Sequence, residues 1–110
     1  MEWVEIAGLA AKASAACEAA LGQPQNDEHR KVLYMTLEPL AARSFLPLSE
    51  EISPHARGLI NQSAFLADIV RGHIEDTWRT KPKRDDALQS VKRSSEHLLK
   101  VLNEIKKRAE

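Results

Sequence analysis

Apolar positions recur along this chain every three or four residues, the spacing that places side chains on one face of an α-helix. No run of β-branched residues alternates with polar ones, so the pattern predicts no strand. Glycine and proline interrupt the pattern and divide it into about four helices. Because short connections make successive helices antiparallel neighbours, the sequence predicts an all-α fold, a compact up-and-down antiparallel bundle.

The first helix is expected to run from about Glu2 to Leu21 and to stop at Gly22, with Pro24 just beyond. Its inner stripe is rich in alanine, which has the highest helix propensity and lets a neighbouring helix approach closely. The stripe is predicted to consist of Trp3, Ile6, Ala10, Ala13, Cys17 and Ala20.

The second helix is expected to begin near Asn26 or Asp27, both favourable N-cap residues. Pro39 has no amide hydrogen for the helix, so a kink or break is expected near this residue. The remainder, through Phe45, should end before Pro47. The apolar side is predicted to consist of Val32, Leu33, Leu37 and Leu40.

The third helix has a clear start, with Ser53 as the cap and Pro54 in the first helical position. A helix that is apolar on several sides is expected to be central to the bundle. Its stripe is predicted to consist of Ala56, Leu59, Ser63, Leu66, Val70, His73 and Thr77, widened by Ile60, Ala67 and Ile74.

The fourth helix is expected to follow residues 80–82 and to run close to the C-terminus. Acidic residues in its first turn and basic residues in its last turn both match the helix dipole. Its apolar residues form an unbroken heptad seam. The seam is predicted to consist of Leu88, Val91, Ser95, Leu98, Leu102 and Ile105.

The length of 110 residues favours a single domain spanning residues 1–110, and no internal repeat is evident. Cys17 is the one cysteine, which suits a reducing compartment, and the alanine-rich first helix carries charges that do not fit a signal peptide or a spanning helix. A cytoplasmic protein that does not associate with a membrane is therefore expected.

Charge is distributed unevenly, although the formal net charge is +0. Residues 1–78 hold 6 Lys and Arg against 11 Asp and Glu, whereas residues 79–110 hold 10 against 5. The basic stripe of the last helix could hold an RNA or DNA backbone or an acidic protein, and it could equally be a solvated face. It consists of Lys92, Arg93, Lys100, Lys106 and Lys107, and it is extended at its start by Arg79, Lys81, Lys83 and Arg84.

Three apolar residues fall outside the predicted core stripes: Phe65, Trp78 and Leu99. A small bundle rarely exposes a contiguous apolar patch without a partner, so these residues are candidates for a homodimer or partner interface. They would be core residues instead if the third helix were enclosed on all sides.

No constellation of residues indicates catalysis, a metal or a cofactor. None of the four histidines follows a carboxylate by three residues, as a di-iron bundle would require, and Cys17 has no partner cysteine nearby. Neither a nucleophile elbow nor a phosphate-binding glycine loop is present. The sequence predicts no enzyme, no cofactor and no small-molecule substrate.

One short segment, Arg93 to His97, superficially resembles the arginine–histidine motif of the HEPN ribonucleases, which are also small and all-α. The two residues here have three intervening residues, fewer than in that motif, and they lie one turn apart in a regular helix. The resemblance covers five residues and would imply a ribonuclease or an inactive relative.

The leading hypothesis is a small non-enzymatic interaction module, such as an adaptor, accessory subunit or inhibitor, that acts through a helix face. The second hypothesis is a nucleic-acid-associated subunit of a larger complex, for example a defence ribonucleoprotein, that uses the basic last helix. The HEPN-like ribonuclease is third.

Overall fold

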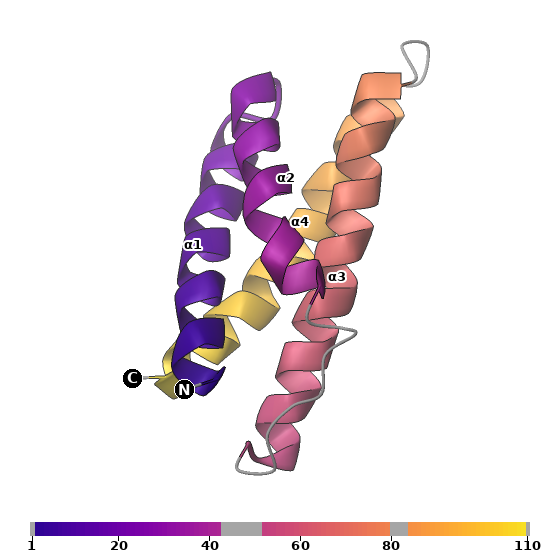
Figure 1. Cartoon of the computed structure of the whole chain (residues 1–110). Coiled ribbons are helices and arrows are strands. Elements are labelled where there is room, and N and C mark those ends of the chain that lie inside the picture. The colour runs from indigo at the N-terminus through magenta and orange to yellow at the C-terminus, as the bar shows by residue number, and fades with distance from the viewer. Residues whose placement is uncertain (1, 43–51, 80–83, 110) are drawn as a thin grey trace.

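Four α-helices make up the part of the chain that the computed structural model describes, residues 2–42, 52–79 and 84–109. They run up and down in chain order around one core, which confirms the predicted all-α antiparallel bundle (Figure 1). The helices are α1 (Glu2–Gly22), α2 (Asp27–Ala42), α3 (Pro54–Arg79) and α4 (Arg84–Ala109).

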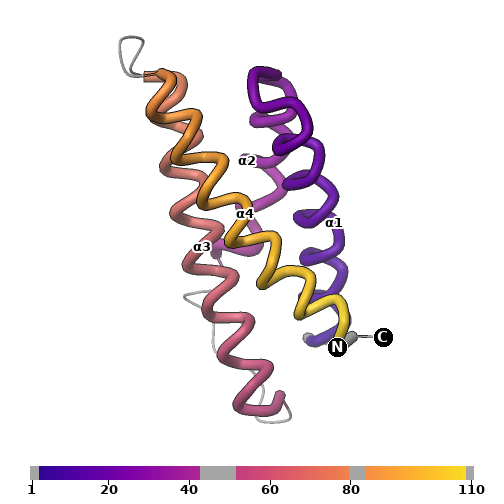
Figure 2. Tube along the Cα trace, turned by 180° about the vertical axis from the view of Figure 1, so that it is seen from behind, coloured from indigo at the N-terminus to yellow at the C-terminus, as the bar shows by residue number. Residues whose placement is uncertain are grey.

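Each helix has two neighbours. α1 lies beside α2 and α4, and α3 lies beside the same two helices. Figure 2 shows α4 crossing from the top of α3 to the foot of α1. Buried residues of all four helices join in one continuous cluster, and this cluster is the single core of the described chain.

Small side chains hold α1 close to its neighbours. The predicted stripe is confirmed: all its members are buried except Trp3, which packs partly buried against the core. Ala10 and Ala13 are fully buried, so α1 itself adds little side-chain bulk to the space between the helices there. The helix includes Gly22, one residue beyond its expected end.

The N-terminus of α2 is capped by Asn26, one of the two predicted caps. Its Oδ1 accepts hydrogen bonds from the amide groups of Glu28 at 2.9 Å and His29 at 3.3 Å. The prediction that Val32 faces the core is wrong, because this residue is 53% exposed. The corresponding inner position, one turn before Leu33, belongs to Arg30, which the sequence pattern did not select as a core residue.

Pro39 lies inside α2, and the helix is not broken there. The helix continues to Ala42, and its last turns lean toward α3 in Figure 1. Proline removes the hydrogen bond to the carbonyl of Met35, but both residues lie on the exposed side, where water can reach that carbonyl. The predicted continuation through Phe45 lies outside the described residues.

The start of α3 and the seam of α4 agree with the sequence, and the predicted α3 stripe is buried except for Leu59 and His73, which are half-buried. Ser53 Oγ accepts a hydrogen bond from the amide of Ala56 at 3.2 Å, so Ser53 is the cap and Pro54 the first helical residue. Every residue of the predicted α4 seam is buried, from Leu88 to Ile105.

The helices α1 and α3 share a burial pattern that the sequence did not reveal. From residue 6 to 21 and from residue 56 to 71, buried, half-buried and exposed positions follow in the same order throughout. Few of the residues at matching positions are identical, so a comparison of residue types finds no repeat. α1 and α3 therefore occupy equivalent positions, in which Ala15 of α1 corresponds to Phe65 of α3.

We predict that Ala13→Leu lowers the free energy of unfolding by about 1–3 kcal/mol, because the added carbons do not fit between closely packed helices. Ala15→Leu is the matched control, since Ala15 is exposed on the same helix, and should change stability by less than about 0.5 kcal/mol. Chemical denaturation of both variants measures the difference. Equal effects would contradict the close packing of α1.

Candidate interaction surfaces

The three residues predicted as a protein interface do not form one patch. Phe65 is 65% exposed, Trp78 is 42% exposed, and Leu99 is partly buried against the core. Along α3, Phe65 and Trp78 are separated by roughly 20 Å at the usual rise per residue. The enclosed alternative does not hold for Phe65, which points away from the core.

Trp78 is fixed by contacts with α2. Its Nε1 donates a hydrogen bond of 2.7 Å to Asp27 Oδ1, and its ring meets the Tyr34 ring edge-on with centroids 5.2 Å apart. These contacts join the end of α3 to the start of α2. The exposed part of Trp78 therefore belongs to a structural contact.

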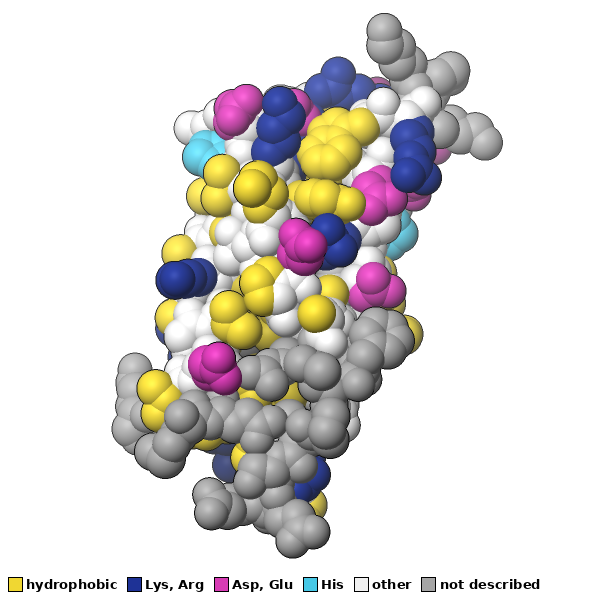
Figure 3. All heavy atoms as spheres, viewed as in Figure 1, with side chains coloured by type: hydrophobic (Ala, Val, Ile, Leu, Met, Phe, Trp, Pro, Cys, Tyr) yellow, Lys and Arg dark blue, Asp and Glu magenta, His cyan; other side chains and the backbone are white. Residues whose placement is uncertain are grey.

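Tyr34 extends the same contact between α2 and α3, and the sequence analysis did not single it out. Its hydroxyl donates a 2.5 Å hydrogen bond to Glu75, and the Arg71 guanidinium lies 4.1 Å from the ring centroid. Arg71 Nε also donates to the Tyr34 carbonyl at 3.2 Å. Figure 3 shows apolar side chains on this α2–α3 face flanked by both signs of charge.

These contacts alter two pKa values. The hydrogen bond from Trp78, helped by nearby Arg30 and Lys31, holds the pKa of the Asp27 carboxyl below its usual range. The hydrogen bond to Glu75 raises the pKa of the Tyr34 phenol. At neutral pH the Asp27 carboxyl is therefore ionised and the Tyr34 phenol is neutral, and both charge states stabilise the contact between α2 and α3.

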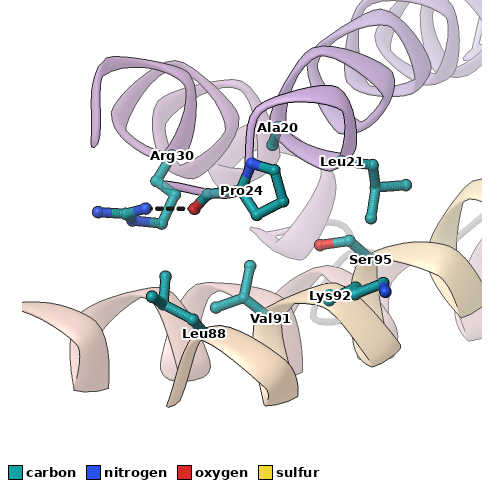
Figure 4. Close-up of a pocket in the computed structure, with 8 residues that line it drawn as sticks. All are labelled: Ala20, Leu21, Pro24, Arg30, Leu88, Val91, Lys92 and Ser95. Carbon is teal, nitrogen blue, oxygen red and sulfur yellow. Dashed lines mark hydrogen bonds between the residues drawn. The ribbon is translucent and has the colours of Figure 1, made fainter. Parts of the chain in front are cut away.

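A hollow between the α1–α2 turn and α4 contains two buried polar atoms without partners in the described chain, Arg30 Nε and Ser95 Oγ. The rest of the Arg30 guanidinium is bonded, to the Pro24 carbonyl at 2.7 Å and to Asp27 at 3.1 Å. In Figure 4, Arg30 and Ser95 lie at opposite sides of the hollow, so they do not converge on one ligand. The remaining lining residues are Ala20, Leu21, Pro24, Leu88, Val91 and Lys92.

The basic stripe of α4 is only partly available. Arg93, Lys100 and Lys107 are exposed, and no ion pair or hydrogen bond joins them to residues that the structure describes. Lys106 is half-buried, with Nζ 3.5 Å from Ser14 Oγ of α1, and Arg79 pairs with Glu75 at 3.2 Å.

Four members of the predicted basic set remain: Arg84, Lys92, Lys81 and Lys83. Arg84 and Lys92 are exposed, and Lys92 also lines the rim of the hollow. Lys81 and Lys83 lie outside the described residues.

The outer face of α3 carries an exposed phenylalanine between two open glycines. Gly58 and Gly72 lie one heptad before and after Phe65, so the three share one side of the helix. A Cβ atom at either glycine would meet nothing within 4 Å. Each glycine costs the helix about 1 kcal/mol relative to alanine, and packing within the chain does not require either.

Other exposed apolar side chains were missed by the sequence analysis. Val4 of α1 is 63% exposed, Met35 of α2 is 70% exposed, and Val32 of α2 is 53% exposed. The exposure of Met35 could have been predicted from the sequence, because Met35 lies between the inner positions of α2. No signal in the helical pattern distinguishes a functional exposed residue from an ordinary one.

The candidate chemical groups, Cys17 on α1 and Arg93 and His97 on α4, are not gathered in the hollow. Cys17 is buried, and burial raises its thiol pKa to about 12, so the thiol stays protonated at neutral pH. Arg93 and His97 are exposed on α4, and neither lines the hollow of Figure 4. Among the described residues, no three His, Cys, Asp or Glu side chains gather as metal ligands would.

Comparisons with protein-family models, curated proteins and solved structures find no match for this chain. None of the described helices contains an apolar stretch that could cross a membrane. The function is therefore argued from the surfaces of the bundle alone.

We predict that Trp78→Phe lowers the free energy of unfolding by about 1 kcal/mol at pH 7, because it removes the hydrogen bond to Asp27. The folded pKa of Asp27 is lowered, so its contribution is complete above the unfolded value of about 3.9 and is lost as pH falls through the folded pKa. The effect of Trp78→Phe should therefore shrink at acid pH.

Asp27→Asn provides the comparison, because the variant removes the titrating group. Denaturation of both single variants and the double variant between pH 7 and pH 3 measures the coupling. A coupling that stayed constant across this range would contradict the assigned role of the Asp27 charge.

Proposed function

We propose that this protein is a non-enzymatic interaction module that binds a protein partner through the outer face of α3 around Phe65. The observation that carries the proposal is the 65% exposure of Phe65 near the middle of α3, a helix of 26 residues whose opposite side is buried in the core. Other large apolar side chains of α3 are buried or packed against the core, apart from Trp78, which is bonded to α2.

Energetics favour burial of this face by a partner. Covering the exposed part of a phenylalanine contributes about 1–2 kcal/mol. The two open glycines leave the helix backbone accessible on either side of the ring, so a partner can approach more closely there than over ordinary side chains.

The distribution of reactive groups supports a non-enzymatic role. The protonated Cys17 thiol is buried and has no base assigned to it in the described structure. The polar groups with the clearest contacts, on Asp27, Tyr34 and Glu75, hold α2 to α3. These groups contribute to stability, and none is directed into the hollow.

We predict that a photoreactive benzoylphenylalanine at position 65 forms covalent adducts with protein in the cells that make this chain. The equivalent position of α1, Ala15, is the matched control and should form few adducts, because it lies on another face of the same bundle. Adducts of any mass at position 65 support the proposal. Their absence, or equal yields at both positions, would contradict it.

A second candidate function is binding of a nucleic-acid backbone or an acidic protein surface by α4. It is favoured by the exposed charges of Arg93, Lys100 and Lys107, which have no opposite charge paired to them within the described helices. Phosphate contacts of this kind give affinity that falls steeply with salt. No aromatic residue of α4 is available to stack on a base.

For this second function we predict that Lys100→Glu weakens binding to short RNA and duplex DNA about tenfold at low salt, and reduces the salt dependence. Lys12→Glu on α1 makes the same charge change on an exposed position and should alter binding less than about twofold. Fluorescence anisotropy measures both. Equal losses, or no binding by the unmodified protein, would contradict this function.

A further inference from the structure

The geometry points to a second copy of this chain as the occupant of the α3 face, packed antiparallel so that Phe65 of each copy lies over Gly58 of the other. This inference rests on the proposed function and goes beyond it by naming the partner. It follows from the spacing of the exposed residues, their charges and the shape of the bundle.

The face is complementary to itself. Phe65 projects from the outer side of α3. The glycines one heptad away lack a side chain on that same side, so each leaves open the space of one side chain, here called a recess. In an antiparallel pair related by a two-fold axis, a residue that contacts a second position is contacted by that position in return. Phe65 of each copy therefore fills the recess at a glycine of the other copy, and the dimer contains this contact twice.

Two alignments satisfy the seven-residue spacing, and charge distinguishes them. If Phe65 lay over Gly72, the two-fold axis would pass between Asp68 and Ile69 and bring the two Asp68 carboxylates together. Like charges placed opposite each other are destabilising. Asp68 is exposed, so no neighbouring helix covers its charge.

The alignment on Gly58 avoids this repulsion. Its axis passes between Asn61 and Gln62, which are exposed and uncharged. An amide side chain both donates and accepts hydrogen bonds, so Asn61 of each copy can bond Gln62 of the other across the axis. The central segment, residues 58 to 65, contains no charged side chain on the outer face.

The shape of the molecule suits this alignment. In Figures 1 and 2, the N-terminal turns of α3 project beyond the ends of α1 and α4. A second α3 can lie along this end of the helix while the two bundles extend in opposite directions. The outer face there consists of exposed or half-buried residues, including Gly58, Asn61 and Gln62.

The contact is small, so the dimer is expected to be weak. A single helix face of this length buries roughly 1,000 Å² in total, at the low end for specific interfaces. A dissociation constant on the order of 100 µM is consistent with an interface of this size. The bundle would then be monomeric when dilute and dimeric at high local concentration.

Sedimentation of the full chain from about 10 µM to about 1 mM tests the inference with three variants. Phe65→Ala removes the projection, and Gly58→Leu fills its recess. Gly72→Leu makes the same change at the glycine that the alignment leaves free. Both leucines lie on exposed helical positions with open space around them, so both variants should remain folded, which helicity and thermal melting check.

We expect the unmodified chain and Gly72→Leu to dimerise with constants within about twofold, and Phe65→Ala and Gly58→Leu to weaken the dimer at least about tenfold. A monomer at every concentration would overturn the inference, as would a dimer equally sensitive, or insensitive, to both glycine changes. The crosslink at position 65 separates the two proposals. Adducts only to a different protein would overturn self-association and leave the proposed function standing.

Discussion

The close approach of α1 to its neighbours is the constraint on which the bundle depends. α1 contributes mostly alanine to the core, including the fully buried Ala10 and Ala13, so the large side chains must come from the other helices. Leu33 and Leu37 of α2 and Leu98 and Leu102 of α4 supply them, all fully buried. A core of mixed small and large residues reaches native packing density only when the distances between the helix axes are fixed.

The packing of the four helices determines which side chains stay available on the outer surfaces of the bundle. The polar and aromatic groups at the end of α3 join it to α2, and Arg30 fastens the start of α2 to the preceding turn. These residues are engaged within the chain. Within the described residues, the outer face of α3, with Phe65 between its glycines, has no comparable internal contact, and the same is true of Arg93, Lys100 and Lys107 of α4.

Local sequence signals predicted most of the fold, because caps and helical periodicity act over a few residues. Ser53 and Asn26 cap the helices, and the α4 seam is buried as predicted. Tertiary contacts could not be predicted in this way. Arg30 is buried because Pro24 and Asp27 accept its hydrogen bonds, and Val32 is exposed because Arg30 and Leu33 occupy the inner positions. Phe65 was selected from sequence, whereas its open glycines became meaningful only in three dimensions.

The proposed function makes the outer face of α3 the surface through which the bundle binds its partner. Amide spectra of the isotope-labelled chain, recorded by nuclear magnetic resonance from dilute to concentrated solution, test this claim most directly. The peaks that move with concentration are expected to belong to residues 54–69 of α3, centred on Asn61 and Gln62, while those of α1 stay fixed. Spectra that do not change, or changes centred on α1 or on the Arg93–Lys107 stripe, would contradict it.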